Sequence, residues 1–245
     1  MAEMGLGYGS EYQLLRYLGH HRNELNDIIN KNTRLKGELL WLDFPKNIKR
    51  LSLDSEYFGL NFLKDKVLKD IFSQSDIKKL ISGWKKYWSV KGTQPNWDGV
   101  ILHKNENQVE LVIVEAKARL GEIESVTNSA SNEKIQKAFI ETKKNLNISN
   151  SNRFGRYYQL ANRLALVNYL QNSNEVGKIN ASLLYIYFLN GYEKRQLKDK
   201  KIVLIENKSV EKQAEWEKVI KEEYIELGIN NIENQYISKI FIDCK

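Results

Sequence analysis

Two apolar segments separated by four polar residues constrain the fold of this chain more than any other feature. The segments at 97–104 and 109–118 are each typical of a β-strand, and the polar loop at 105–108 is short enough to join them as an antiparallel hairpin. If this loop pairs Lys104 with Val109, the register of the whole hairpin follows by counting back from that pair. The sequence thus predicts which side chains face one another.

The predicted register places two acidic side chains opposite each other. Asp98 pairs with Glu115, and opposed residues have Cβ atoms about 4.5–5.5 Å apart, close enough to share one cation. Because side chains alternate between the two faces of a strand, Lys117 lies on the face of Glu115, whereas Val114 and Ala116 point away. The hairpin therefore predicts a cluster of two acids and one amine.

Two facing carboxylates repel each other, so a positive charge is expected between them. Mg²⁺ is suitable because it prefers oxygen ligands and commonly takes one or two carboxylates together with waters and substrate phosphate. A metal ion there, with Lys117 beside it, would favour hydrolysis of a phosphodiester. The alternative is a surface hairpin whose Glu115 and Lys117 face solvent. The apolar run at 111–114 favours a buried central strand instead, in which charged groups need partners.

An acid followed two residues later by lysine is not informative by itself. The chain contains further triples of this kind, and the one at 206–208 also ends an apolar run, although no Pro-x-x-Asp strand precedes it at hairpin distance. These triples include Asp76-Ile-Lys78, Glu141-Thr-Lys143, Asp199-Lys-Lys201 and Glu206-Asn-Lys208. The hairpin around Asp98, rather than the triple, carries the prediction.

The rest of the chain alternates helical and strand patterns, which predicts an α/β fold. The continuous apolar run at 182–190 is typical of the interior of a sheet. No linker-like segment interrupts the apolar residues, so residues 1–245 are expected to form a single domain. Helices are expected at 10–30, 57–72, 76–88, 135–146, 157–171 and 209–227, and further strands at 38–44, 182–190, 201–205 and 236–243.

Two acidic residues of the predicted first helix are unusual, because they fall on or near its apolar side. At 100° per residue, Glu11 falls within the apolar stripe of Leu14, Leu18 and Leu25, and Glu24 falls near its edge. A glutamate in the first turn is also favoured by the helix dipole alone. Two interpretations of Glu11 therefore remain open: an acid placed on the buried stripe for a purpose of its own, or a residue that only stabilises the start of the helix.

Charge and cysteine content restrict the partner and the compartment. A net charge of +7 favours a polyanion such as nucleic acid as the partner. Cys244 is the only cysteine, which excludes an internal disulfide framework and a zinc site built on cysteine pairs, and suggests a reducing compartment. No apolar run is long enough to cross a membrane and the N-terminus has no signal-peptide pattern, so a cytoplasmic protein without membrane contact is expected.

At its central stretch the chain resembles the PD-(D/E)xK nuclease superfamily, which has the restriction-endonuclease-like fold. Pro95-Asn-Trp-Asp98 resembles the first motif with two residues inserted between Pro and Asp, and Glu115-Ala-Lys117 resembles the second. The resemblance implies an α/β fold with a central mixed β-sheet flanked by helices, built on an α-β-β-β-α-β core with extra helices. The helices expected at about 57–90 would be an insertion into that core.

The resemblance also implies roles for the residues of the two motifs. Asp98, Glu115 and the backbone carbonyl of Ala116 would bind Mg²⁺, for which Mn²⁺ can substitute, and Lys117 would assist the attacking water.

Outside the motifs, the resemblance implies roles for residues of two helices. The helix before the sheet often supplies another acid, which matches Glu11 best, with Glu24 as the reserve. Gln159 resembles a glutamine that some members carry on the helix after the second motif, and it would bind substrate. Arg163, one turn further on, could contact phosphate.

The predicted function is that of a Mg²⁺-dependent nuclease that hydrolyses phosphodiester bonds in DNA, and many enzymes of this fold act as homodimers to cut two strands. The alternative is a catalytically inactive module that keeps the fold and binds nucleic acid or protein, which the intact acid, acid and lysine argue against. A nuclease that binds its metal through histidine is disfavoured, because adjacent His20 and His21 do not share a helical face. These two and His103 are expected at the surface.

Overall fold

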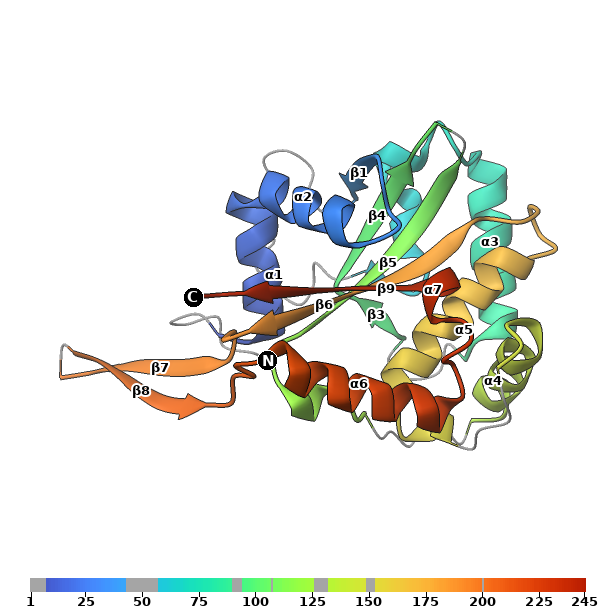
Figure 1. The fold of residues 1–245 in the computed structure, drawn as a ribbon. Coiled ribbons are helices and arrows are strands. Elements are labelled where there is room, and N and C mark those ends of the chain that lie inside the picture. Colours follow the sequence, from blue (N-terminus) through green and yellow to red (C-terminus); the bar gives the residue numbers. More distant parts are fainter. Residues whose placement is uncertain are drawn as a thin grey trace.

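A five-stranded mixed sheet forms the centre of the structure, a computed structural model that describes residues 8–42, 57–89, 94–106, 108–125, 132–148, 153–199 and 201–245. The strand order is β1-β4-β5-β6-β9, and helices cover both faces (Figure 1). β1, β4 and β5 are antiparallel neighbours, whereas β5, β6 and β9 run parallel. The predicted α/β class with a central mixed sheet is therefore confirmed. The strands are β1 Glu38–Trp41, β4 Gly99–Lys104, β5 Val109–Lys117, β6 Ala181–Leu189 and β9 Ile237–Asp243.

The β4–β5 hairpin has the predicted register. Its pairs run from Lys104 with Val109 to Gly99 with Val114. β5 is the middle strand of the sheet and is buried from its second residue to its last, as the apolar run predicted. β6 lies inside the sheet between β5 and β9, which was also predicted.

The helices divide between the two faces of the sheet. α1 (Gly9–His20) and α2 (Arg22–Asn32) pack on the face to which Val112 and Val114 point. The opposite face receives Leu111 and Ile113, and is covered by α3 (Gln74–Tyr87), α4 (Glu133–Asn145), α5 (Tyr158–Asn172) and α6 (Gln213–Leu227). Because side chains alternate along β5, Glu115 and Lys117 point to this second face, away from α1.

The helix predicted at 10–30 is two helices. His21 has φ −127° and ψ 30°, which ends α1, and α2 starts at Arg22 in a different direction (Figure 1). The apolar positions after Leu18 therefore belong to another helix axis, and the phase that related Glu24 to the stripe of α1 is wrong. The bend lets two short helices bury their apolar sides on one face of the sheet.

The helix predicted at 57–72 is absent from the described residues, whereas α3 confirms the next prediction. The chain instead forms β2 (Tyr57–Phe58) and two 3₁₀ turns, η2 (Asn61–Lys64) and η3 (Lys66–Leu68). Gly59, at φ +52°, turns the chain after β2, and Asp65 caps η3 by accepting a hydrogen bond from the Val67 N–H. The apolar spacing thus reflected burial of this segment rather than helical structure.

The strand predicted at 97–104 is interrupted. β3 (Asn96–Trp97) pairs with β2 in a separate small sheet, and β4 begins only at Gly99. Asp98 lies at this break, where the chain passes from one sheet to the other. At the first strand, residues 43–44 of the predicted range lie outside the described residues.

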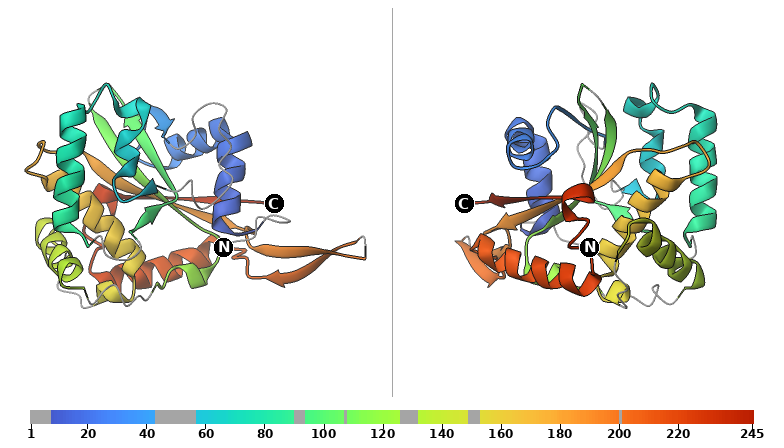
Figure 2. Two further views of the ribbon diagram at one scale, coloured as in Figure 1. Left: turned by 180° about the vertical axis from the view of Figure 1, so that it is seen from behind. Right: turned by 45° about the vertical axis from the view of Figure 1, so that its right-hand side comes forward.

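A two-stranded hairpin projects from the body of the protein. β7 (Glu193–Lys198) pairs antiparallel with β8 (Lys201–Asn207), and the views in Figures 1 and 2 show this arm extending away from the sheet and helices. A strand was predicted at 201–205 as part of the α/β order, but it pairs outside the central sheet. β7 was not predicted because its sequence is almost entirely polar.

The remaining elements follow the predictions closely. α4, α5, α6 and β9 occupy the expected segments, and the short elements η4 (Leu120–Glu122), η6 (Arg153–Gly155) and α7 (Glu233–Tyr236) complete the described chain. No helix in the described part of the chain is long and apolar enough to span a bilayer.

Candidate active site

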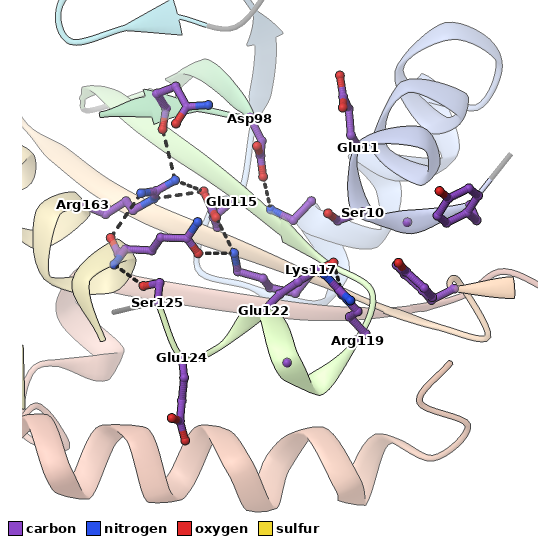
Figure 3. A pocket seen from close by; sticks show the side chains of 17 residues that line it. Ser10, Glu11, Asp98, Glu115, Lys117, Arg119, Glu122, Glu124, Ser125 and Arg163 are labelled. Atoms are coloured by element: carbon purple, nitrogen blue, oxygen red, sulfur yellow. Dashed lines mark hydrogen bonds and ion pairs between the residues drawn. The ribbon is translucent and has the colours of Figure 1, made fainter. Parts of the chain in front are cut away.

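A cavity of roughly 580 Å³ lies at the carboxyl end of β5, between the starts of α1 and α5. The β5 residues that line it include Ala116, between the two charged positions of the second motif. The structure thus brings the side chains predicted for the site, apart from Glu24, to one cavity (Figure 3). They are Glu11, Asp98, Glu115, Lys117, Gln159 and Arg163.

Asp98 reaches this cavity by leaving the hairpin ladder. The ladder ends at Gly99 and Val114, and Oδ2 of Asp98 accepts a hydrogen bond from the backbone N–H of Ala116 at 2.8 Å. The predicted direct pairing of Asp98 with Glu115 is therefore replaced by a contact one residue further along β5. Burial raises the pKa of Asp98 to about 7, and the negative charge of Glu115 adds to the shift.

Glu115 is buried and neutralised by two cations from the protein itself. Its Oε1 accepts a hydrogen bond from Nζ of Lys117 at 2.6 Å, and its Oε2 accepts one from Nε of Arg163 at 3.0 Å. Burial alone would raise the pKa of Glu115, but the charges of Arg163 and Lys117 outweigh it and lower the pKa. The positive charge expected beside the acids is thus supplied, at Glu115, by the side chains of Lys117 and Arg163.

Lys117 is held at a fixed position although its side chain is long. Its ammonium also donates a hydrogen bond to Oε1 of Gln159 at 2.7 Å, and only 5% of the residue is exposed. Gln159 sits in the first turn of α5, where its N–H donates to Oγ of Ser125 at 2.8 Å. Gln159, expected to contact substrate, is therefore placed as a partner of the lysine.

Arg163 lines the inner side of the cavity, is buried, and connects α5 to the strands. Besides Glu115, its guanidinium donates to the Asn96 carbonyl at 3.1 Å and to Oδ1 of Asn162 at 2.8 Å, and it lies 5.3 Å from the centre of the Trp97 ring. Only 3% of the residue is exposed. Arg163, expected to meet phosphate, is mainly an ion-pair partner of Glu115.

The two helix acids have different surroundings. Figure 3 shows Glu11 rising from α1 on the far side of the cavity from Glu115 and Lys117, because α1 packs on the other face of the sheet. Glu24 does not line the cavity; its side chain is 58% exposed and pairs with His21 at 3.2 Å. Glu24 as the reserve acid is therefore wrong.

The donor set is suited to a hard divalent cation. No three His, Cys, Asp or Glu side chains within the described ranges form a ready metal-binding group. Mg²⁺ requires fewer, because one or two carboxylates with waters suffice. Asp98, partly exposed and raised in pKa beside a second acid, favours a nearby cation. The residues fit such an ion if Glu115 exchanges its contact with Lys117 or Arg163.

Several residues around the cavity were not predicted. Tyr8 packs edge-on against Tyr192 with ring centres 5.2 Å apart, and the guanidinium of Arg119 lies 4.9 Å from the Tyr192 ring centre. Glu122 accepts a hydrogen bond from the Ala118 N–H at 2.9 Å and so shapes the turn after β5. These residues come from separate segments, and no local pattern connects them.

Glu223 of α6 is a second buried acid near the site. Only 3% of it is exposed, and its Oε2 has no hydrogen-bond partner among the residues described. Burial raises its pKa to about 8; the charge of Lys117 opposes the shift and that of Glu115 adds to it. Nothing in the sequence distinguished it from the other glutamates of this helix.

His103 is buried, so the expectation that it lies at the surface is wrong. Its Nδ1 lies 3.4 Å from Oε2 of Glu110, and its Nε2 lies 2.9 Å from the carbonyl of Lys36. His103 does not line the cavity. The characteristic groups of the cavity are therefore the acids and Lys117.

Comparison of the chain with models of protein families, with curated proteins and with solved structures finds no match.

Proposed function

We propose that the protein is a metal-dependent nuclease of the PD-(D/E)xK type that hydrolyses phosphodiester bonds in DNA. The observation that carries the proposal is the meeting of Asp98, Glu115 and Lys117 in one cavity at the end of the β4–β5 hairpin. Asp98 is fixed there by the N–H of Ala116, the residue between the other two. The core elements around this hairpin follow one another along the chain as helices, three antiparallel strands, helices and a parallel strand. This is the order that the resemblance implies.

Asp98, Glu115 and the carbonyl of Ala116 would hold Mg²⁺, or Mn²⁺ in its place. When bound, the ion would supply Lewis-acid polarisation of a phosphoryl oxygen and a more acidic bound water. Asp98 and Glu115 lie beside each other, and the pKa of Asp98 is raised. A divalent cation bound there would neutralise their negative charge, which favours its uptake.

The side chains of the protein would orient the phosphate around that ion. Lys117, fixed between Glu115 and Gln159, presents an ammonium that can stabilise charge on phosphate oxygens. The first turn of α1, where Ser10 and Glu11 line the cavity, offers the positive end of a helix to a phosphate. Glu11 could also complete the metal's shell through water.

The charge of the chain agrees with a polyanionic substrate. The net charge is +7, and Arg119 adds a partly exposed cation at the cavity. The single cysteine cannot form an internal disulfide, which agrees with a reducing compartment such as the cytoplasm.

A second function has one specific observation in its favour. Both oxygens of Glu115 are already engaged by Lys117 and Arg163, so this acid is stable without a metal ion. A module that keeps the fold and binds nucleic acid or protein without cutting would need no more than this.

Cleavage assays separate the two functions. Supercoiled plasmid, linear duplex, single-stranded DNA and RNA are incubated with Mg²⁺ or Mn²⁺ and with wild type, Asp98→Ala, Lys117→Ala or the control Lys134→Ala, an exposed lysine of α4. We expect wild type and the control to cut DNA and the two site variants to lose at least about a hundredfold in rate. Equal cutting by all four would refute the site, and binding without any cutting would establish the inactive module.

A further inference from the structure

A group of polar side chains is buried beneath α6 without hydrogen-bond partners. Among the described residues, the atoms concerned include Oε2 of Glu223 and the hydroxyl oxygens of Tyr185, Tyr187 and Tyr224. Each of these four residues is at most 3% exposed. A buried polar atom without a partner costs stability, so a cluster of such atoms requires a partner that comes from solvent or from another state of the protein.

The cluster lies beside the second motif on the same face of the sheet. In the parallel β5–β6 pair, Tyr185 is the neighbour of Glu115. Tyr187, two residues further on, is the neighbour of Lys117. Strand alternation turns these side chains toward the face that α6 covers. The ring centre of Tyr187 lies 4.9 Å from that of Trp216, which places the start of α6 over this part of the sheet.

Glu223 is close enough to both charged residues of the motif for their charges to act on it. Burial raises the pKa of Glu223 to about 8, the positive charge of Lys117 opposes this shift, and the negative charge of Glu115 adds to it. The other titratable groups that interact with Glu223 are the three tyrosines of the cluster, and burial raises the pKa of each of them. At neutral pH Glu223 is therefore largely protonated, and a closer approach of Lys117 would ionise it.

We propose that Glu223 is a positioning residue for Lys117, whose ammonium it binds when Glu115 turns to a metal ion. The inference rests on the proposed function, because it requires the metal site at Asp98 and Glu115. In the metal-free protein, Lys117 donates to Glu115 and Gln159, which uses two of its three N–H donors. When Glu115 leaves, Glu223 releases its proton to solvent and its carboxylate takes the place of Glu115, while Gln159 keeps the ammonium at the cavity.

Lys117 needs a new partner more than Arg163 does. After Glu115 is withdrawn, the guanidinium of Arg163 keeps the carbonyl of Asn96 and Oδ1 of Asn162 as acceptors. Lys117 would keep a neutral amide as its partner within the described ranges. A buried ammonium without an anion is strongly disfavoured, so its charge must be met by another carboxylate.

Two acids at the cavity rim are already engaged and are less suitable. Glu122 accepts a hydrogen bond from the N–H of Ala118 and pairs with Arg119. Glu124 pairs with Arg156 at 2.7 Å and is exposed. The buried acid of α6, in contrast, has an oxygen without a hydrogen-bond partner in the part of the chain that the structure describes.

A mutant cycle in the metal-free protein tests the exchange of partners. Asp98→Asn combined with Glu115→Gln removes both carboxylates from Lys117, as a bound ion would. In wild type, Glu223→Gln should raise the urea midpoint at pH 7, because it replaces a buried acid without a partner. In the double variant, the same change should lower the midpoint, because Lys117 then loses its remaining buried carboxylate. A change of the same sign in both backgrounds overturns the proposal.

Proton release on Mg²⁺ binding is a second measurement, which remains available if the triple variant does not fold. Titration calorimetry at pH 7 in buffers of different ionisation enthalpy gives the number of protons released. Wild type should release about one more proton per ion than Glu223→Gln, because Glu223 ionises as it binds Lys117, whereas Asp98 contributes equally to both. The control Glu222→Gln changes an exposed residue of α6 and should match wild type.

The outcomes of this titration separate the inference from the proposed function. Equal proton release by wild type and Glu223→Gln overturns the role of Glu223 and leaves the metal site standing. If wild type binds neither Mg²⁺ nor Mn²⁺, the proposed metal site is refuted, and the role of Glu223 is refuted with it.

Discussion

The carboxylate of Asp98 accepts a hydrogen bond from the backbone N–H of Ala116, with 2.8 Å between Oδ2 and the nitrogen. Ala116 lies between Glu115 and Lys117. The contact therefore holds Asp98, which lies at the break between β3 and β4, against the centre of the second motif. Asp98 thereby stays partly exposed in the cavity, beside the negative charge of Glu115.

Stability should fall as pH rises through the titration of Asp98. Its folded pKa of about 7 is above the ordinary value of 3.8, so between about pH 4 and pH 7 the folded state holds a proton that the unfolded state has lost. The unfolding free energy then decreases with pH, by less than about 1.4 kcal/mol per unit because solvent reaches the group. Asp98→Asn should flatten this part of the profile. Urea unfolding from pH 4 to pH 8 measures it, and an unchanged slope in the variant would contradict the assignment.

Divalent cations should stabilise the protein through the same acids. Mg²⁺ and Mn²⁺ are expected to raise the melting temperature of wild type, because a ligand that binds only the folded state stabilises it. The shift should disappear in Asp98→Asn and become smaller in Glu11→Gln. Glu24→Gln is the matched control, since Glu24 is exposed and does not line the cavity. Thermal unfolding monitors the shifts, and one of equal size in Asp98→Asn would place the metal elsewhere.

Removal of the Arg163 guanidinium should destabilise the fold. Arg163→Met leaves Glu115 buried with Lys117 as its remaining ion-pair partner, and loss of one member of a buried pair costs about 3–5 kcal/mol. Arg163→Lys keeps the positive charge but lacks the planar guanidinium with its paired N–H donors, so we expect an intermediate loss of unfolding free energy. Urea denaturation at pH 7 gives the values. Addition of Glu115→Gln to Arg163→Met should recover part of the loss; a purely additive double variant would show that the two residues do not interact.

Glu223 should reduce stability at alkaline pH. Burial raises its pKa to about 8 from 4.5, so the folded state retains a proton that the unfolded state releases, and stability decreases as pH rises between these values. Glu223→Gln resembles the protonated acid and should gain stability relative to wild type from pH 6 to pH 9. Its exposed neighbour provides the control, Glu222→Gln, for which no such gain is expected. Equal profiles for both variants would show that Glu223 does not titrate as described.

The sequence by itself determined the β4–β5 hairpin and the shared face of Glu115 and Lys117. Both are local properties: a four-residue loop fixes the pairing of Lys104 with Val109, and strand alternation fixes which neighbours point together. The same reasoning failed at His21, where a pattern of apolar spacing could not reveal that the helix bends.

Only the tertiary structure decided what surrounds these two residues. Arg163 meets Glu115 across 48 positions, and α1 packs on the opposite face of the sheet from them. Such contacts depend on how helices pack against a sheet, which spacing within one element does not specify. Asp98 also left the ladder because its chain joins two sheets, a constraint set by β2 and β3 rather than by the hairpin.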